Sequence, residues 1–204
     1  MRLMDSLRIS ITIDGKLVDL ELDNFIKECN RIGGEVIEQA RTNLAEADKI
    51  VTGTLAKSLY FELIEDDEGL VIKFMGAPYY DFVEQGVQGA ANNAKAPDSP
   101  YQFGTGSGEK GALRPAIKKW IRDKGISNSS WRDKQGRFLS IDAMSKRISR
   151  SVYLTGLKPT YYYQMAINQQ MKRMAKRLQM ALGEDVDIFM TDNYSRTFSI
   201  EITI

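Results

Sequence analysis

Apolar and polar residues alternate in several short stretches of this chain, a pattern that predicts β-strands with one buried face. The first stretch covers residues 7–13, and an Asp14-Gly15 turn connects it to a second short strand at residues 17–22. The last residues, 198–204, alternate in the same way. We expect these terminal strands either to join the sheet of a central hairpin or to extend the sheet of a neighbouring copy by edge addition.

The central hairpin is predicted between two rigid turns. Alternating residues at 59–63 and an apolar run at 70–75 flank segment 65–69, whose acidic residues and final glycine are typical of a hairpin turn. Before the hairpin, segment 51–59 places a glycine between two threonines, so that a hydroxyl can cap a short helical turn. After it, segment 76–87 breaks the strand with glycine and proline and forms one amphipathic helical turn that a second glycine closes.

Helical spacing dominates the rest of the chain. Apolar residues recur every three or four positions from about residue 25 to 44, which predicts a helix that begins at Asp23 or Asn24, its expected N-cap, and ends near Ala47. The Gly33-Gly34 pair in this helix indicates either a bend or a close contact with another backbone. Three further helices are predicted at residues 112–124, 138–154 and 161–182.

These patterns together predict an α+β fold in a single domain over residues 1–204. In this fold an antiparallel sheet, made of the central hairpin and the terminal strands, packs with the long N-terminal helix and several C-terminal helices. Cys29 and Trp120 lie at core-facing helical positions and are expected to be buried apolar residues. Of the three consecutive tyrosines at 161–163, at least two are expected in the core.

Residues 86–112 keep neither a helical nor a strand period and are rich in glycine. This composition predicts a long mobile loop. Loops of this length in a compact domain are often functional. The isolated aromatic residues Tyr101 and Phe103 give the loop two anchors with which to bind a partner.

The composition argues against most enzyme classes. The 204-residue chain contains no histidine, the commonest general base and metal ligand. The acidic cluster at 65–68 lies in a turn without calcium-loop spacing, and the glycines at 104–108 lack the preceding strand and the lysine of a phosphate-binding loop. We therefore expect no enzymatic activity, no metal and no cofactor.

No apolar run is long enough to cross a membrane, and the N-terminus lacks the apolar core of a signal peptide. We expect a soluble protein made in the cytoplasm, without a membrane partner. Its net charge of +1 hides an asymmetry, because residues 109–182 hold 17 Lys or Arg against 4 Asp or Glu, whereas the remaining residues are acidic. Opposite poles favour head-to-tail assembly of identical subunits.

Four segments in order carry a resemblance to a known family: T-G-x-L-x-x-S within 51–59, Y-x-x-F-V-E-x-G within 76–87, P-x-I-x-x-W-I-x-x-K-G-I within 114–126, and G-L-x-P-T followed by aromatic residues within 156–167. Their arrangement resembles the head-tail joining, neck and tail-completion proteins of tailed double-stranded DNA phages. One position departs from the family pattern, since Val87 stands where a threonine often follows the glycine.

The resemblance implies a structural virion protein, located in the neck or tail region and made in the host cytoplasm. It would form a ring of six or twelve copies that joins the portal and adaptor proteins of the head to the tail. The residues expected at subunit or partner interfaces are Thr52, Thr54, Tyr79, Tyr80, Phe82, Glu84, Tyr101 and Phe103. Four basic residues could face a channel through which DNA passes without sequence-specific binding: Lys172, Arg173, Lys176 and Arg177.

Two other functions remain open from the residues alone. The basic segment 109–182, with the tyrosines at 161–163 beside it, could make the chain a nucleic-acid-binding module, although no recognition-helix or RNA-platform motif is present. A muralytic or nuclease activity would need a paired acid and base on a recognisable scaffold, and the sequence offers no such pair.

Overall fold

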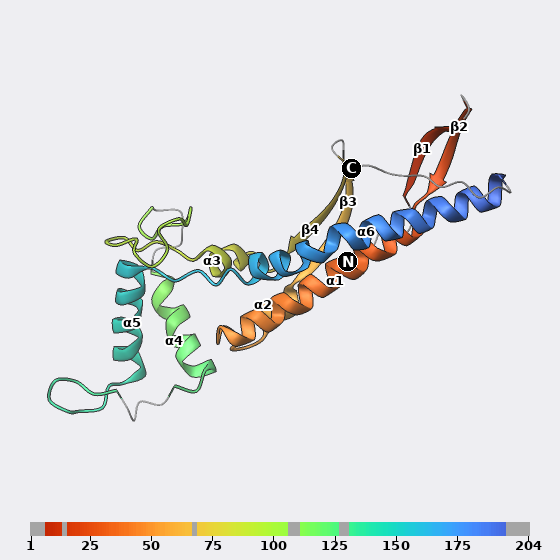
Figure 1. Cartoon of the computed structure of the whole chain (residues 1–204). Helices are drawn as coiled ribbons and strands as arrows, with labels where there is room; N and C mark the ends of the chain where they lie inside the picture. The colour runs from red at the N-terminus through yellow and green to blue at the C-terminus, as the bar shows by residue number, and fades with distance from the viewer. Residues whose placement is uncertain (1–6, 14–15, 67–68, 106–110, 127–130, 195–204) are drawn as a thin grey trace. The chain divides into compact units, whose positions relative to one another are not determined.

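The computed structural model describes residues 7–13, 16–66, 69–105, 111–126 and 131–194. The chain divides into two compact units (Figure 1). Unit 1 comprises Met1–Gln39, Tyr60–Met75 and Gln164–Ile204, and unit 2 comprises Ala40–Leu59 and Gly76–Tyr163. The chain passes repeatedly between the units, and the expectation of a single domain over residues 1–204 stays a prediction.

The elements follow the predicted order. They are β1 (Arg8–Ile13), β2 (Lys16–Glu21), α1 (Asp23–Glu46), α2 (Thr54–Ser58), β3 (Tyr60–Asp66), β4 (Gly69–Met75), α3 (Tyr80–Gln85), α4 (Leu113–Asp123), α5 (Ile141–Thr155) and α6 (Tyr162–Tyr194). The α+β class is therefore confirmed, with a long N-terminal helix and several C-terminal helices. Within the described residues, no helix combines the length and apolar character needed to cross a membrane.

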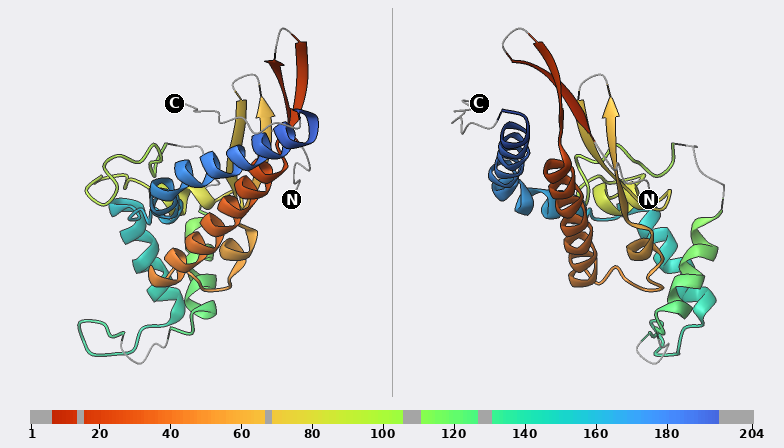
Figure 2. Two further views of the ribbon diagram at one scale, coloured as in Figure 1. Left: turned by 45° about the vertical axis from the view of Figure 1, so that its right-hand side comes forward. Right: turned by 90° about the vertical axis from the view of Figure 1, so that its right-hand side faces the viewer.

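The strands form two separate antiparallel hairpins, drawn as distinct ribbons in Figure 2. In β1–β2 the register pairs Ile13 with Lys16, and in β3–β4 it pairs Tyr60 with Met75. The prediction that the N-terminal strand joins the sheet of the central hairpin is thus wrong. Alternation tells which face of a strand is buried but not which strand lies beside it. The predicted strand at 198–204 lies outside the described residues.

The core of unit 1 forms where α1 meets β3. Ile26, Cys29 and Leu63 are buried together, with residues of β4 and α6 packed against them. Cys29 is only 2% exposed, which confirms it as a buried apolar residue. Burial, with a smaller effect from the Glu28 charge, raises the pKa of its thiol to about 11, so Cys29 is protonated and unreactive at neutral pH.

The two glycines in α1 have different environments. A Cβ atom added to Gly33 would lie 2.6 Å from the Phe61 ring of β3, whereas one added to Gly34 would have no neighbour within 4 Å. Gly33 therefore lets the Phe61 ring pack directly against the backbone of α1. The predicted close contact is present, but it is made by an aromatic side chain rather than by a second backbone.

This difference yields a paired test. Gly33→Ala is expected to destabilise unit 1 by about 2 kcal/mol, because the new methyl group displaces the Phe61 ring. Gly34→Ala is expected to stabilise it by roughly 0.5 kcal/mol, because alanine favours the helix and nothing obstructs its methyl group. Urea unfolding followed by far-UV circular dichroism measures both; equal changes in the two variants would contradict this account.

Helices α4 and α5 build a core in unit 2. Ile121, Leu139 and Met144 are buried there, and Trp120 lies partly buried against them. The side chain of Ser140 caps α5 by accepting a hydrogen bond from the backbone N–H of Ala143 at 3.2 Å. Trp120 thus packs against the core as predicted, although Ile121 beside it is the fully buried residue.

The described part of the long loop, residues 86–105, contains no helix or strand, as predicted, but it is fastened at several points. Gln88 donates from its backbone N–H to the Tyr101 carbonyl at 2.8 Å, and Phe103 donates to the Gln88 carbonyl at 3.0 Å. The hydroxyl of the buried Ser99 donates to the Gly86 carbonyl at 2.8 Å. These bonds fold the segment back on itself.

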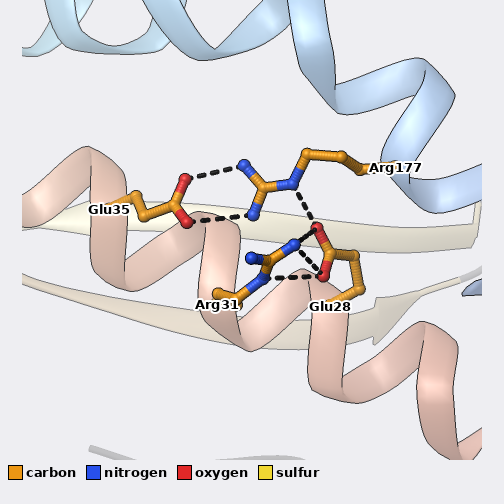
Figure 3. A network of polar contacts seen from close by, with 4 residues as sticks. All are labelled: Glu28, Arg31, Glu35 and Arg177. Carbon is orange, nitrogen blue, oxygen red and sulfur yellow. Dashed lines mark hydrogen bonds and ion pairs between the residues drawn. The ribbon is translucent and has the colours of Figure 1, made fainter.

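Helix α6 extends beyond the predicted end at Leu182 to Tyr194. Gly183, the residue after the predicted end, lies within the helix. Between Arg177 and Asp185, α6 lies alongside the first half of α1 within unit 1, and polar contacts join the two helices (Figures 1 and 3).

Candidate functional site

The first two motif segments meet in unit 2 through one serine. Ser58, at the end of the 51–59 segment, donates from its hydroxyl to the Leu55 carbonyl at 2.8 Å. The same oxygen accepts the backbone N–H of Ala77 at 2.9 Å. Ser58 therefore fixes the turn that precedes the central hairpin to the turn that follows it.

These two turns and α4 enclose an apolar groove of about 430 Å³. Ile50 and Tyr79 are each 41% exposed at this groove, so its edge presents apolar surface to solvent. Trp120 lies against it from the third motif segment. The full lining is Leu44, Lys49, Ile50, Val51, Thr52, Gly53, Thr54, Leu55, Ala56, Tyr79, Val83, Ala116, Lys119, Trp120 and Asp123.

Two ion pairs lie in this part of unit 2. Lys119 and Asp123 pair at 2.8 Å along the exposed side of α4. Asp48, which precedes the groove residue Lys49 in the sequence, pairs with Lys124. The hydrogen bond from Lys124 holds the pKa of the Asp48 carboxyl below its usual value. The groove therefore combines an apolar floor with charged residues close to its edge.

The fourth motif segment packs directly on the second. Val87 and Leu157 exchange backbone hydrogen bonds at 3.0 and 2.8 Å. Gly86 and Gly156 lie beside this bridge with backbone torsion angles of φ 71°, ψ −172° and φ 78°, ψ −175°, a conformation that is nearly exclusive to glycine. The Thr160 hydroxyl donates to the Val83 carbonyl at 2.7 Å. We call this assembly the glycine corner.

Comparisons with protein-family models, curated proteins and solved structures found no match. The candidate site therefore rests on the residues and geometry of this chain. The resemblance to neck and tail-completion proteins stays a prediction.

Several predicted interface residues pack against other residues of unit 2. The Phe82 ring meets Tyr101 edge-on at 4.5 Å between centroids, and Phe103 packs on Tyr153 at 6.0 Å. The two predicted anchors of the loop thus bind within the chain. Phe82 nevertheless remains 44% exposed, so the pair still offers an aromatic surface to a partner.

Glu84 and Tyr80 have internal partners as well. Glu84 is only 9% exposed, and its carboxylate accepts the backbone N–H of Tyr163 at 3.0 Å. Tyr80 meets the Tyr163 ring edge-on at 6.3 Å, and burial raises the pKa of its hydroxyl. Glu84 therefore anchors the start of α6 and is too buried to form a main part of an exposed interface. Tyr162 and Tyr163 are buried, which confirms the prediction for at least two of the three tyrosines.

The threonine pair meets the start of α2 in a different geometry from a regular N-cap. The N-cap residue is Gly53, in a left-handed conformation at φ 74°, and the Thr52 hydroxyl accepts a long hydrogen bond of 3.5 Å from the backbone N–H of Thr54, the first residue of the helix. The Thr52 and Thr54 hydroxyls lie 2.8 Å apart at the exposed edge of the groove. Both residues are thus available for contact with a partner.

The four predicted channel residues belong to unit 1 and separate into two groups. Lys172, Arg173 and Lys176 are exposed on α6. Arg177 differs, because its guanidinium binds both oxygens of Glu35 at 2.7 and 3.0 Å and also pairs with Glu28 (Figure 3). The hydrogen bonds from Arg177 hold the pKa of Glu35 below its usual value. Arg177 is thus a structural link between α6 and α1, not an exposed cation.

The groove offers apolar surface and hydroxyl groups rather than a recognisable acid–base pair. Its aspartate, Asp123, is already paired with Lys119. Within the ranges that the structure describes, no cluster of three acidic or cysteine side chains could hold a metal ion. Sequence reasoning missed Ser58, Ile50 and Lys119 as site residues; of these, only Ser58 had a signal, as the last position of the first motif.

Proposed function

We propose that this chain is a structural virion protein of a tailed double-stranded DNA phage, which forms an oligomeric ring in the neck and joins the portal and adaptor proteins of the head to the tail. The observation that carries the proposal is the convergence of the motif segments in unit 2. Three of them line one groove, and the fourth packs on the second in the glycine corner. In this role the protein needs no catalytic residue, metal or cofactor, and no membrane.

The groove is the proposed docking site for a neighbouring copy of the chain in the ring. Exposed apolar residues at its edge, Ile50 and Tyr79, would become buried on assembly. The opposite charges of segment 109–182 and the remaining residues would orient each copy against the next. A head-to-tail contact of this kind closes into a ring when its rotation divides the circle evenly.

A nucleic-acid-binding module is the second candidate, and the exposed Lys172, Arg173 and Lys176 favour it. The engagement of Arg177 by two carboxylates weakens it, because this residue cannot also bind phosphate without breaking its ion pairs. In the proposed ring the exposed Lys172 would face passing DNA through weak contacts, since tight phosphate binding would hinder the movement of the DNA.

The mass of the full-length protein by light scattering, at low and high salt, tests the proposal, with electron microscopy of the same sample. We expect closed rings of six or twelve copies that bind a short random-sequence DNA duplex weakly. A chain that stays smaller than a ring at every concentration and binds this duplex tightly, with a steep salt dependence, would instead support the nucleic-acid module.

A pair of tyrosine variants tests the groove itself. Tyr79→Ala removes an exposed ring at the groove, whereas Tyr161→Ala removes one of nearly equal exposure, 40% against 41%, that does not line it. We expect ring formation to weaken at least tenfold in the first variant and to be unchanged in the second. Equal behaviour of the two variants would place the subunit contact elsewhere.

A further inference from the structure

One side of α6 carries a regular stripe of five exposed residues: Arg173, Lys176, Met180, Glu184 and Asp187. They follow one another at intervals of three, four, four and three residues, the spacing that keeps side chains on one side of a helix. Met180 at the centre is 59% exposed. We call these residues the α6 stripe.

The charges of the stripe are arranged symmetrically about Met180. Lys176 and Glu184 lie four residues on either side of it, and Arg173 and Asp187 lie seven residues on either side. A second copy of the helix turned end for end would therefore place its acidic residues opposite the basic residues of the first. A parallel copy would place like charges together, which is unfavourable.

Contacts within unit 1 leave the five stripe residues exposed, although these contacts run along one edge of the stripe. Arg177 lies beside Glu184 on the helix surface, and Arg177 and Asp185 attach α6 to α1 through hydrogen bonds. Met180 and Glu184 line a shallow groove of about 290 Å³ between the two helices, which gives an incoming methionine room to pack. The lining from α1 includes the exposed Lys27 and Arg31, and Arg31 is paired with Glu28 in the same groove.

We propose that two copies of this chain associate through the α6 stripe in antiparallel orientation, with Met180 of both copies on the two-fold axis. Each Arg173 would pair with Asp187 of the other copy, and each Lys176 with Glu184. The contact goes beyond the proposed ring, because a two-fold contact joins the same patch on both copies, whereas a ring needs two different patches. It joins copies in pairs.

Charge-reversal variants of the full-length protein provide the test. Glu184→Lys with Asp187→Lys makes all four charges of the stripe positive, and Arg173→Glu with Lys176→Glu makes all four negative. We expect each double variant to show half the mass of the wild-type species in sedimentation at low salt, since every contact across the axis becomes repulsive. An equimolar mixture of the two double variants should regain the wild-type mass.

The variant with all four substitutions is the matched control. Its stripe is again complementary in antiparallel orientation, so we expect the wild-type mass; its recovery also excludes misfolding as the cause of the loss in the double variants. Rising salt should weaken the wild-type pair at least tenfold, because exposed ion pairs are screened. Double variants that keep the wild-type mass, or a fourfold variant that stays at half of it, would overturn the proposal.

The result of the charge-reversal test can be distinguished from the result of the test of ring formation. Loss of the two-fold contact halves the mass of whatever assembly the wild type forms, whereas the Tyr79→Ala variant tests the groove in unit 2. If the charge-reversed variants still form rings, the proposed function stays intact. If the mass of these rings also equals that of the wild-type assembly, the two-fold contact is refuted.

Discussion

Replacing Gly156 with alanine is expected to destabilise unit 2 by about 4 kcal/mol. The new Cβ atom would lie 2.2 Å from the Val87 carbonyl oxygen, and this oxygen belongs to the backbone bridge of the glycine corner. Two effects add at this position: a conformation that side chains disfavour, at roughly 1–3 kcal/mol, and overpacking against rigid backbone, at roughly 1–3 kcal/mol. Rotation of a side chain relieves neither effect, because the strained torsion angles and the crowded atoms both belong to the backbone.

Gly125→Ala is the matched control for this substitution. Gly125 also follows a helix and has a positive φ of 64°, but a Cβ atom there would have no neighbour within 4 Å. We expect Gly125→Ala to lower the stability of unit 2 by about 1 kcal/mol, from the left-handed conformation alone. Trp120 and Trp131 both belong to unit 2, so urea unfolding followed by tryptophan fluorescence measures both variants. Similar losses of stability in Gly156→Ala and Gly125→Ala would show that the glycine corner is not tightly packed.

Removing the carboxylate of Asp185 is expected to destabilise unit 1 by about 3 kcal/mol. Its two oxygens accept the backbone N–H groups of Asn24 and Phe25, both at 2.9 Å, at the start of α1. The residue before the helix is Leu22, whose side chain has no hydrogen-bond acceptor, so Asp185 of α6 takes the place of a local N-cap. The loss of two charge-assisted hydrogen bonds and of a favourable charge at a helix N-terminus makes Asp185→Ala costly.

Gln179→Ala provides the comparison, because Gln179 is exposed on the same helix six residues earlier and lies outside the α6 stripe, whereas Asp185 is only 4% exposed. We expect Gln179→Ala to change stability by less than about 0.5 kcal/mol. Urea unfolding followed by far-UV circular dichroism distinguishes the two variants. Asp185→Asn, which keeps one acceptor, should fall between them. If Asp185→Ala were as stable as Gln179→Ala, the cap would contribute nothing.

The Asp185 cap also corrects a prediction. The sequence indicated Asp23 or Asn24 as the N-cap of α1, because polar residues with acceptor side chains favour this position. In the structure α1 begins at Asp23, and the cap comes from a residue far along the chain. A local pattern marks where a helix begins, but a partner distant in the sequence leaves no trace in that pattern.

Much of the local architecture followed from the sequence. The two hairpins, the extent of α1, the glycine that ends α3 and the burial of Cys29 were all predicted. Each depends on periodicity or on a residue with a special backbone preference, and these properties act over a few neighbouring positions. The predicted helix ended at Leu182, whereas in the structure contacts with α1 on both sides of Gly183 hold the longer α6 together.

The candidate site was predictable in its parts but not in its arrangement. The sequence identified Thr52, Tyr79 and Trp120 in separate motifs, and the structure places all three around one groove. It also named Glu84 and Arg177 as surface residues, whereas both make internal polar contacts. A charged side chain in a sequence does not reveal whether it meets solvent or a complementary group from another segment.

By itself, the sequence determined which of the described segments form strands and helices, because these follow from short-range spacing and the steric limits of the backbone. Only the tertiary structure decided that the two hairpins form separate sheets, that Asp185 caps α1, that Arg177 is bound to Glu28 and Glu35, and that the motif segments enclose a groove. These contacts join residues far apart in the chain, and their energies depend on three-dimensional packing that no local pattern encodes.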